Sequence, residues 1–425
     1  MADFAISSDP AVQHQLDRLA TLSPGADILG LERISALLDR LGNPERALPP
    51  VFHVAGTNGK GSTCAFLRAM IEAEGLSAHV YTSPHLVRFN ERIRLAGKLI
   101  DDALLAPLLE EVLEAADDLR ASFFELTTAA AFLAFARTEA DACIVEVGLG
   151  GRLDATNVVP SPAACGIAAL GIDHQSFLGD TLAQIAGEKA GIARAGVSIA
   201  TLAYPPDAEV PIEDQVSRTG AKRLKLGRDW HLSAGIYRDA DGSITLPALT
   251  LAGAHQQQNA GLALAMLRHQ SAVTVTDANL VRGLSTAHWP ARMQRLGPGP
   301  LVGAREVLLD GGHNPSAAEA LAAALQGRTF DVVLGMLANK DAEAFLALLM
   351  PIVRSVVAVP IAGHAHHAPE KLCAIARTLG VLASAAATLG EALNQPADET
   401  PAPVLITGSL YLAGEVLRLN GELPQ

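Results

Sequence analysis

The feature that most constrains the fold is a glycine-rich stretch from Val51 to Thr63, which reads V-F-H-V-A-G-T-N-G-K-G-S-T. A short apolar run leads into three glycines, a lysine and two hydroxyl residues, and a helical pattern follows. Such a strand–loop–helix unit suits a phosphate group, because glycines bring backbone N–H groups close to an anion and the helix start adds unpaired donors. We predict that Lys60 contacts β- and γ-phosphate oxygens and that Ser62 or Thr63 supplies a hydroxyl for Mg²⁺.

This stretch departs from the common phosphate-binding loop at two positions. The usual pattern G-x-x-x-x-G-K-[ST] needs a glycine and a hydroxyl residue where this chain has Val54 and Gly61. The alternative is a glycine-rich turn that carries a solvated lysine. The order of strand, glycines, lysine and helix favours the phosphate site, but it does not say what the phosphate is for.

Composition narrows the class of protein. A length of 425 residues predicts two or three domains, and 49% hydrophobic residues provide for a large core. The formal net charge of −13 argues against a nucleic-acid-binding protein, although a local cationic site can still bind an anionic substrate. We therefore expect small-molecule substrates and no nucleic-acid partner.

Cysteine usage and the N-terminus bear on the compartment. The four cysteines are scattered and form no C-x-x-C pair, which favours a reducing compartment without structural zinc. The first 15 residues lack a signal-peptide pattern, and no apolar run is long enough to span a membrane. We expect a soluble, cytoplasmic protein without a membrane partner.

Apolar strands alternate with amphipathic helices from residue 51 onward. This alternation predicts an α/β fold with a P-loop-type parallel sheet covered by helices on both faces. Ligands of such sheets bind at the carboxyl ends of the strands, and the polar motifs at 56–62, 148–157 and 171–175 each follow a predicted strand. The predicted strands are 51–55, 78–82, 142–147, 163–169 and 197–201, and the helices between them are 62–74, 102–120, 125–138, 181–194 and 207–219.

The remaining chain predicts a second domain. A hairpin at 222–252 and helices at 255–269 and 277–287 close the first domain. Gly297-Pro-Gly-Pro300 interrupts the pattern, and βα alternation restarts after it. We predict a nucleotide-binding domain over residues 1–296 and a smaller, Rossmann-like α/β domain over residues 297–425.

Two charged residues stand in apolar surroundings. Glu146 interrupts an apolar strand, which is costly unless a metal such as Mg²⁺ or a cation such as Arg152 compensates the carboxylate. Lys189 falls on the apolar face of its predicted helix, so it is paired or modified there, or it extends to the surface. His174, after another strand, is either a metal ligand or an ordinary loop histidine.

Three further polar groups are candidate nucleotide contacts. Asn259, at a helix start, either bonds a base or phosphate or belongs to a polar cap. Arg292 suits a bidentate phosphate contact but also a solvent-exposed surface. Asp310 and His313 lie in L-L-D-G-G-H-N-P at the end of a predicted strand, where an Asx-type turn is the alternative.

Taken together, these motifs resemble the folylpolyglutamate synthase/dihydrofolate synthase family, within the larger group of ATP-dependent Mur-type ligases. The resemblance runs from about residue 27 to Ser409 and is specific because several motifs occur in one order. The matching stretches are G-T-N-G-K-G-S at 56–62, S-P-H-L-V-R-F-N-E-R at 83–92, E-V-G-L-G-G-R-L-D-A-T-N at 146–157, G-E-K-A-G-I at 187–192 and D-G-G-H-N-P at 310–315.

The resemblance implies a role for each matching residue. Lys60, Lys189 and His313 are the implied catalytic residues, with Lys189 carbamylated. Implied ATP contacts are Gly59, Lys60, Gly61, Ser62, Asn259, Arg292 and Asp310. Implied Mg²⁺ ligands, for two sites, are Ser62, Glu146, His174 and carbamylated Lys189. Implied pterin contacts are Leu29, Gly30, Leu31, Phe123, Phe124, Glu125, Leu153 and Asp154.

The implied reaction is an ATP-dependent carboxylate–amine ligation, catalysed by a monomer. L-Glutamate would be joined to dihydropteroate, and also to the γ-carboxylate of folates, through an acyl phosphate while the two domains close over ATP. Two alternatives are a Mur-type ligase that builds peptidoglycan precursors and a P-loop nucleotide-binding module without ligase chemistry. The Phe123–Glu125 stretch argues against the first alternative, and the second α/β domain argues against the other.

Overall fold

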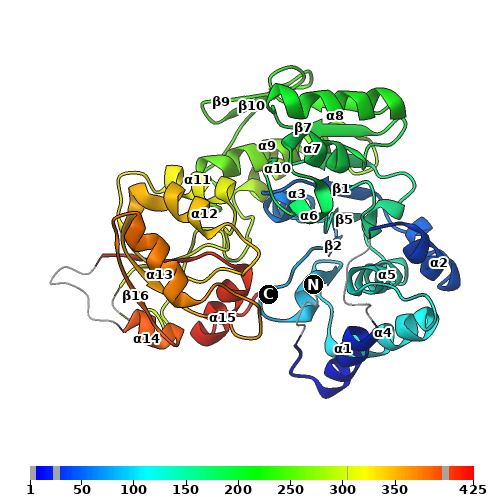
Figure 1. Ribbon diagram of the computed structural model, residues 1–425. Coiled ribbons are helices and arrows are strands. Elements are labelled where there is room, and N and C mark those ends of the chain that lie inside the picture. Colours follow the sequence, from blue (N-terminus) through cyan, green and yellow to red (C-terminus); the bar gives the residue numbers. More distant parts are fainter. Residues whose placement is uncertain (1–5, 23–28, 304, 395–401) are drawn as a thin grey trace. The chain divides into compact units, whose positions relative to one another are not determined.

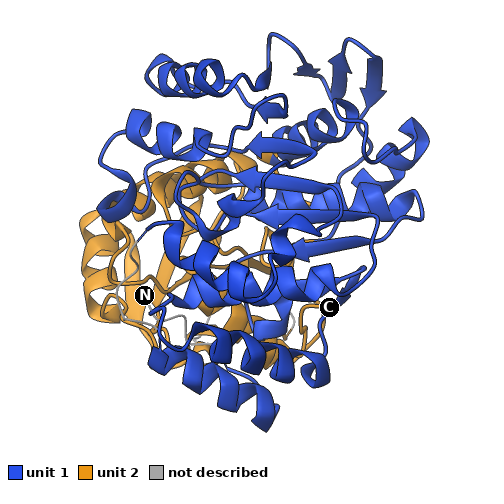
Figure 2. Cartoon of the chain, turned by 90° about the vertical axis from the view of Figure 1, so that its right-hand side faces the viewer, with its two compact units in different colours: residues 1–250, 256–288 blue, residues 251–255, 289–425 orange. Residues whose placement is uncertain are grey.

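The computed structural model describes residues 6–22, 29–303, 305–394 and 402–425. It divides into two compact units, which Figure 2 shows in different colours. The first comprises residues 1–250 and 256–288, and the second comprises residues 251–255 and 289–425. The transition at 288/289 lies before the expected 296/297, because strand β12 (Gln294–Arg295) pairs with β13 of the second unit.

The first unit contains an eight-stranded sheet in the order β4-β3-β2-β5-β1-β6-β7-β8. Six neighbouring strands of this sheet run parallel, which confirms the α/β prediction; in sheet order they are β2, β5, β1, β6, β7 and β8. An antiparallel ribbon, β3 and β4, extends one edge and was not expected from the sequence. The strands are β1 Val51–Ala55, β2 Ala78–Tyr81, β3 Ile93–Leu95, β4 Lys98–Leu99, β5 Ala142–Glu146, β6 Ala164–Ile167, β7 Ser198–Thr201 and β8 Lys222–Lys225.

Helices cover both faces of this sheet (Figure 1). One face carries α1 (Pro10–Leu22), α2 (Glu32–Arg40), α4 (Asp102–Ala116) and α5 (Phe123–Ala136) on one half, and α7 (Leu182–Ala190) and α8 (Pro206–Thr219) on the other half. The opposite face carries α3 (Lys60–Ala73), α9 (Ala254–Arg268) and α10 (Asp277–Leu284). Met266 of α9 lies against Gly166 of β6, where a Cβ would come within 2.3 Å of its sulfur.

Short elements complete the first unit. A turn at Ala234 and Gly235, both with positive φ, divides the expected hairpin into three strands, β9 (His231–Ser233), β10 (Ile236–Asp239) and β11 (Gly242–Thr245). The remaining short helices are η1 Pro44–Arg46, η2 Phe89–Arg92, η3 Ala155–Val158 and α6 Gln175–Leu178.

The second unit contains a six-stranded sheet in the order β12-β13-β17-β14-β15-β16. Among the described strands of this sheet, only β12 runs antiparallel to its neighbour, so the others form the expected Rossmann-like arrangement. Its strands are β13 Val307–Leu309, β14 Phe330–Leu334, β15 Val353–Ala358, β16 Leu382–Ala385 and β17 Val404–Thr407. Its helices are α11 Pro315–Ala324, α12 Ala342–Leu349, η4 Met350–Ile352, α13 Pro369–Thr378, α14 Leu389–Leu393 and α15 Leu410–Asn420. Within the described residues, no helix has the length and apolar character needed to cross a membrane.

Candidate active site

The glycine-rich loop lies between β1 and α3, as the sequence predicts, and the end of β6 fixes its backbone. The amide N–H groups of Thr57 and Asn58 both donate to the carbonyl of Ala169, at 2.8 and 3.1 Å. Gly59 has φ +85°, a left-handed conformation that favours glycine, and α3 begins directly after it at Lys60. The loop therefore presents a helix N-terminus at the carboxyl edge of the sheet, the usual position for an anion.

Three charged side chains gather around the carbonyl of Gly56. Lys60 Nζ donates to this oxygen at 3.1 Å, and Lys189 Nζ donates to it at 3.0 Å. Lys60 Nζ also lies 3.9 Å from Glu146 Oε1, and the Glu146 carboxylate is buried. Two cations and one carboxylate from β5, α3 and α7 thus meet at the phosphate loop, which brings three of the predicted site residues together.

Lys189 does not extend to the surface. It is 4% exposed, and burial followed by the nearby charge of Lys60 lowers its pKa from 10.5 to about 7. Asp173, Asp154 and Glu188 act in the opposite direction. A neutral amine near pH 7 is a nucleophile, which a charged ammonium is not, so this lysine has the chemistry that carbamylation requires.

The loop after β6 carries His174 and is tied to the phosphate loop. Thr57 Oγ1 donates to the carbonyl of Gly171 at 3.0 Å and accepts from the Gly171 amide at 3.1 Å. His174 is exposed and has a left-handed backbone conformation at the start of α6. Asp173, its neighbour, is close enough to Lys189 to raise the pKa of that lysine. The loop thus lies beside the phosphate site, whereas metal ligation by His174 stays a prediction.

The two hydroxyl candidates on α3 differ in their environment. Thr63 Oγ1 donates to the carbonyl of Gly59 at 2.9 Å, within its own helix. Ser62 is 2% exposed and occupies the first turn of α3. Because this bond holds the Thr63 hydroxyl against the backbone of its own helix, Ser62 is the better candidate for a cation ligand.

Arg152 is not the partner of Glu146. Arg152 Nη2 lies 2.7 Å from Glu188 Oε1, and the Arg152 amide donates to the carbonyl of Glu188 at 2.8 Å. The contact partners of Glu146 include Lys60 and the Ser83 amide, which lies 3.3 Å from Glu146 Oε2. The alternative in which Arg152 neutralises Glu146 is therefore wrong.

Asn259 lies directly over the phosphate loop. A Cβ at Gly59 would come within 2.4 Å of Asn259 Oδ1, so only glycine fits beneath this side chain. Asn259 is buried, and its Nδ2 donates to Gln256 Oε1 at 3.0 Å. It is thus a packed and oriented group of the loop rather than a solvated cap.

The predicted pterin contacts gather at the starts of α2 and α5. Arg33 Nε of α2 lies 3.0 Å from Glu125 Oε2, which joins the two helix starts. Phe124 lies against the loop that follows β5, where a Cβ at Gly148 would come within 2.3 Å of the ring. We call this part of the first unit the acceptor region; it comprises residues 29–31, 123–125 and 148–154.

Asp154 is a deeply buried member of the acceptor region. It is 2% exposed, and Oδ2 accepts from the Leu149 amide at 2.8 Å while Oδ1 accepts from the Thr156 amide at 3.0 Å. Burial raises the pKa of this carboxyl, and the bonds from Thr156, Leu149 and Gly148 oppose the shift. Asp154 therefore holds the loop after β5, whether or not it also contacts a substrate.

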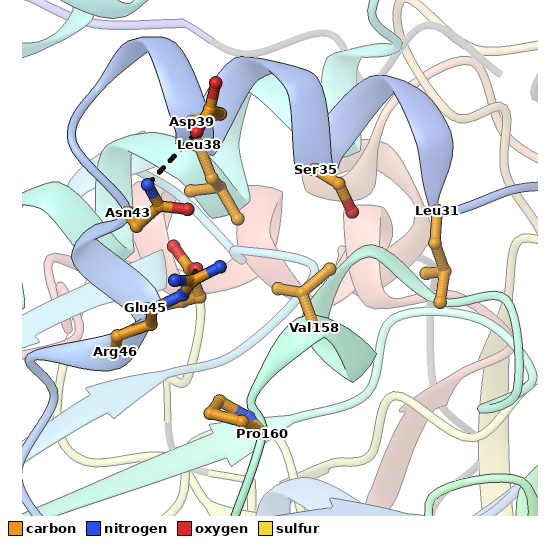
Figure 3. Close-up of a pocket in the computed structure, with 9 residues that line it drawn as sticks. All are labelled: Leu31, Ser35, Leu38, Asp39, Asn43, Glu45, Arg46, Val158 and Pro160. Carbon is orange, nitrogen blue, oxygen red and sulfur yellow. Dashed lines mark hydrogen bonds and ion pairs between the residues drawn. The ribbon is translucent and has the colours of Figure 1, made fainter.

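A cavity of about 380 Å³ adjoins the acceptor region and shares Leu31 with it (Figure 3). Its polar side chains are partly engaged with each other, since Asn43 donates to Asp39 at 3.2 Å and Arg46 lies 3.3 Å from Glu45. The lining residues come from α2 and the residues that flank it, from η1, and from the end of η3 and the segment after it, and none belongs to the phosphate loop: Leu31, Ser35, Leu38, Asp39, Asn43, Glu45, Arg46, Val158 and Pro160.

The second unit brings Arg292 and Asp310 together. Met293 N donates to Asp310 Oδ2 at 2.9 Å, and Gly311 N donates to the carbonyl of Ala291 at 2.9 Å. Ala291 and Met293, on either side of Arg292, both have positive φ, 55° and 46°. A positive φ is uncommon in non-glycine residues and such residues are concentrated at functional sites, so this backbone supports a functional role for Arg292.

His313 follows in the same loop. Its Nδ1 lies 3.0 Å from the carbonyl of Gly311, and Asn314 caps α11 by accepting from the Ala317 amide at 2.9 Å. Asp310 Oδ1 accepts from the Gly312 amide at 2.8 Å. The Asx-type turn that the sequence allows does form, and it presents the half-buried His313 at the carboxyl end of β13.

Comparison with known proteins identifies the family. Residues 302–419 match the family model for the dihydrofolate synthetase C-terminal domain. The folylpolyglutamate synthase of Lacticaseibacillus casei is 34% identical over 406 residues, which cover 90% of this chain and 92% of that protein. The chain belongs to the folylpolyglutamate synthase/dihydrofolate synthase family.

Solved structures from folylpolyglutamate synthase/dihydrofolate synthases have the same fold. Escherichia coli FolC in complex with DHPP and ADP is 32% identical with a TM-score of 0.85, and the match covers 97% of each chain. A bifunctional folylpolyglutamate synthase/dihydrofolate synthase with Mn, AMPPNP and L-glutamate bound is 30% identical with a TM-score of 0.84, covering 97% of this chain and 99% of that one.

Two residues near these sites, Ser83 and His255, were not selected from the sequence. Ser83 lies against Glu146, and a serine directly after a parallel strand was the available signal. His255 is half-buried, and its pKa is lowered by burial and by Arg292 but raised by Asp310, so it lies near both. Its position at the start of a predicted helix gave no signal of its own.

Proposed function

We propose that this chain joins L-glutamate to dihydropteroate, forming dihydrofolate, and also to the γ-carboxylate of folates, with ATP as the energy source. The observation that carries the proposal is the meeting of Lys60, Lys189 and Glu146 around the Gly56 carbonyl, beside the acceptor region. Relatives with ADP, DHPP, AMPPNP or L-glutamate in their structures support the same substrates.

The first step activates the carboxylate. A carboxylate oxygen of the acceptor attacks the γ-phosphorus of ATP, the bond to the β-phosphate oxygen breaks, and ADP leaves. Lys60 at the start of α3 contacts the transferred group and stabilises the charge that develops on its oxygens. Gly59 and Gly61 let the backbone approach the phosphates, and Asn259 holds Gly59 from above.

The second step forms the amide. The amine of L-glutamate attacks the acyl carbon, gives up a proton, and expels inorganic phosphate with cleavage of the carbon–oxygen bond. We assign Arg292 and Asp310 of the second unit to ATP contacts and His313 to the catalytic group. The protein's main contribution to both steps is positioning and charge stabilisation.

The site suits divalent cations. Buried Glu146 and Ser62 offer the hard oxygen donors that Mg²⁺ prefers, and a carbamylated Lys189 would add a carboxylate-like oxygen. Bound Mg²⁺ would offset charge on the phosphates. We assign Ser62, Glu146, His174 and carbamylated Lys189 as the residues that would hold two ions.

The acceptor region accounts for the specificity. Phe123, Phe124 and Leu31 provide apolar and aromatic surface for a flat pterin ring, and Glu125, paired with Arg33, lies at its polar side. Leu29, Gly30, Leu153 and Asp154 complete the assigned contacts.

We further propose that the enzyme acts as a cytoplasmic monomer without nucleic-acid partners.

Phosphate release tests this proposal. With ATP, dihydropteroate and L-glutamate all present, we expect steady release of inorganic phosphate. Omission of either dihydropteroate or L-glutamate should reduce this release to background. Phosphate release that ignores both acceptors would refute the ligase. Tetrahydrofolate in place of dihydropteroate tests the second activity in the same assay, and Lys222→Ala at an exposed lysine serves as the unaffected control.

A further inference from the structure

A buried histidine of β1 lies on the sheet face that α5 covers. His53 is 1% exposed and lies on the same face as Val51 and Val145, which belong to the apolar core there. A polar ring at this position is costly unless it is bonded. Its Nε2 lies 2.8 Å from the hydroxyl oxygen of Thr156, a residue 103 positions later in the chain.

Thr156 connects His53 to Asp154. The Thr156 hydroxyl bonds Asp154 Oδ1, and the Thr156 amide donates to the same oxygen at 3.0 Å. Both carboxylate oxygens of Asp154 accept backbone N–H groups, so this carboxylate is an acceptor and receives the hydroxyl proton of Thr156. The hydroxyl oxygen must then accept from His53, which fixes the histidine as the Nε2–H tautomer.

The far side of Asp154 holds the loop that follows β5. Asp154 Oδ2 accepts from the Leu149 amide at 2.8 Å. The preceding residue, Gly148, lies beneath the ring of Phe124, and a Cβ there would come within 2.3 Å of Phe124 Cζ. The position of this loop therefore sets the position of an aromatic wall of the acceptor region.

We propose that His53 and Thr156 are positioning residues for the acceptor: through Asp154 they hold the Gly148–Leu149 backbone, and with it Phe124, in the geometry that binds the pterin. This inference rests on the proposed function, because it assigns a task to residues beneath the same acceptor region. None of these bonds includes a residue of the phosphate loop, so we expect a larger effect on binding of the acceptor than on binding of ATP.

The tautomer gives the inference its own spectroscopic readout. Burial, and after it the charge of Arg194, lowers the pKa of His53 to about 3, so the ring stays neutral at working pH. In long-range ¹H–¹⁵N NMR spectra of the whole chain, we expect the Nε2–H form of His53 from about pH 6 to about pH 8. A ring that titrates near its ordinary pKa, or that shows the Nδ1–H form, would overturn the assigned direction of the hydrogen bond between His53 and Thr156.

Steady-state kinetics provide the main test. In His53→Leu and in Thr156→Val, which lose the donor and the hydroxyl respectively, we expect KM for dihydropteroate to rise roughly tenfold while KM for ATP stays unchanged. His53→Gln offers an amide N–H toward Thr156 and should restore most of the wild-type KM. Two variants make the test robust if one of them folds poorly.

His79→Leu is the matched control. His79 is also fully buried on this sheet face, where it stacks on Phe135 with ring centroids 4.7 Å apart and bonds the Thr138 carbonyl at 3.0 Å. Its loss should lower the melting temperature without changing KM for dihydropteroate. Equal KM increases in His79→Leu and His53→Leu would show general loosening and overturn the positioning role.

The outcomes separate this inference from the proposed function. If wild-type protein releases no phosphate with dihydropteroate and L-glutamate, the proposed function fails first. If wild-type is active and both His53→Leu and Thr156→Val keep its KM for dihydropteroate, the positioning role alone is refuted.

Discussion

Two buried cations of the first unit, Arg223 and Lys189, have opposite surroundings. Arg223 of β8 has a side chain 1% exposed, and its guanidinium lies 2.8 Å from Glu209, 2.6 Å from Glu213 and 3.1 Å from the Thr201 hydroxyl. Lys189 of α7 is 4% exposed, bonds the Gly56 carbonyl and faces a second cation, Lys60. The first is surrounded by compensating groups, whereas the second is placed so that it loses its proton easily.

This difference separates a structural charge from a reactive one. The ion pairs of Arg223 with Glu209 and Glu213 join β8 to α8, and breaking them leaves those carboxylates without their buried partner. A buried amine beside another cation shifts its pKa toward neutral pH, which is the signature of groups that carry chemistry. The comparison predicts that Lys189 matters for activity and Arg223 for stability.

The largest effect is expected for Lys189→Ala. Loss of this side chain should reduce ligase activity by roughly 10³-fold, because a group that supports the phosphoryl transfer is removed. The melting temperature should not fall, since a buried amine of lowered pKa contributes no net stability at neutral pH. Added short carboxylates, such as acetate or propionate, should restore part of the activity. Wild-type activity in this variant would refute a catalytic role for Lys189.

Arg223→Met should show the reverse pattern. The substitution removes the buried partner of Glu209 and Glu213, which keep Lys225 and Arg228 respectively, and should cost about 2 kcal/mol in the free energy of unfolding. Denaturant titration measures this loss, and phosphate release per folded molecule should stay at the wild-type level. A large fall in kcat with unchanged stability would contradict the distinction between the two cations.

The pH dependence sharpens the comparison. The pKa of Lys189 is lowered from 10.5 to about 7, so the neutral amine that reacts with carbon dioxide is the minor form below pH 7 and the major form above it. Activity should therefore rise roughly tenfold from about pH 6 to about pH 8, and added bicarbonate should raise it most at the acidic end. A flat profile without a bicarbonate effect would argue against a titrating Lys189.

The same shift predicts how stability changes with pH. Between pH 7 and 10.5 the unfolded chain holds a proton on Lys189 that the folded chain lacks, so this residue's contribution to stability rises with pH in that window. Lys189→Met should flatten that part of the stability profile. Urea midpoints measured at several pH values for both proteins test the sign, and a fall in the wild-type contribution would contradict it.

The smallest effect is expected at an exposed ion pair near the same site. Arg152 pairs with Glu188 at 2.7 Å, but the Arg152 side chain is 55% exposed. Arg152→Gln should change the free energy of unfolding by less than about 1 kcal/mol, since solvent screens such pairs. A loss as large as that of Arg223→Met would show that exposure does not separate the two classes of pair.

The alternation of strands and helices predicted most of this fold, and the exceptions have physical reasons. β16 has the sequence Leu-Ala-Ser-Ala, which lacks the β-branched residues that mark a strand, so neighbouring β15 decides its conformation. The strands β3 and β4 are only three and two residues long, and β3 pairs with β2. Such elements depend on tertiary contacts that no local pattern contains.

The candidate site was predictable where a single motif carries the chemistry. The phosphate loop stood out by its glycine-rich motif, and Glu146 and Lys189 stood out as charged residues in apolar surroundings. The structure brings all three together. Partnerships between distant segments were not predictable: Arg152 contacts Glu188 instead of Glu146, and His53 bonds Thr156 across 103 positions. Pairing of this kind follows from sheet register and loop packing rather than from spacing in the sequence.

Ligation through an acyl phosphate transfers one oxygen atom from the acceptor carboxylate to the released phosphate. Dihydropteroate labelled with ¹⁸O in its carboxylate should be incubated with the enzyme, ATP and L-glutamate, and the released phosphate analysed by mass spectrometry. We expect one ¹⁸O atom in each phosphate, because the bridging oxygen leaves with phosphorus when the amine attacks the acyl carbon. Phosphate that is released without label would contradict the acyl phosphate and the phosphoryl-transfer role assigned to Lys60, Glu146 and Lys189.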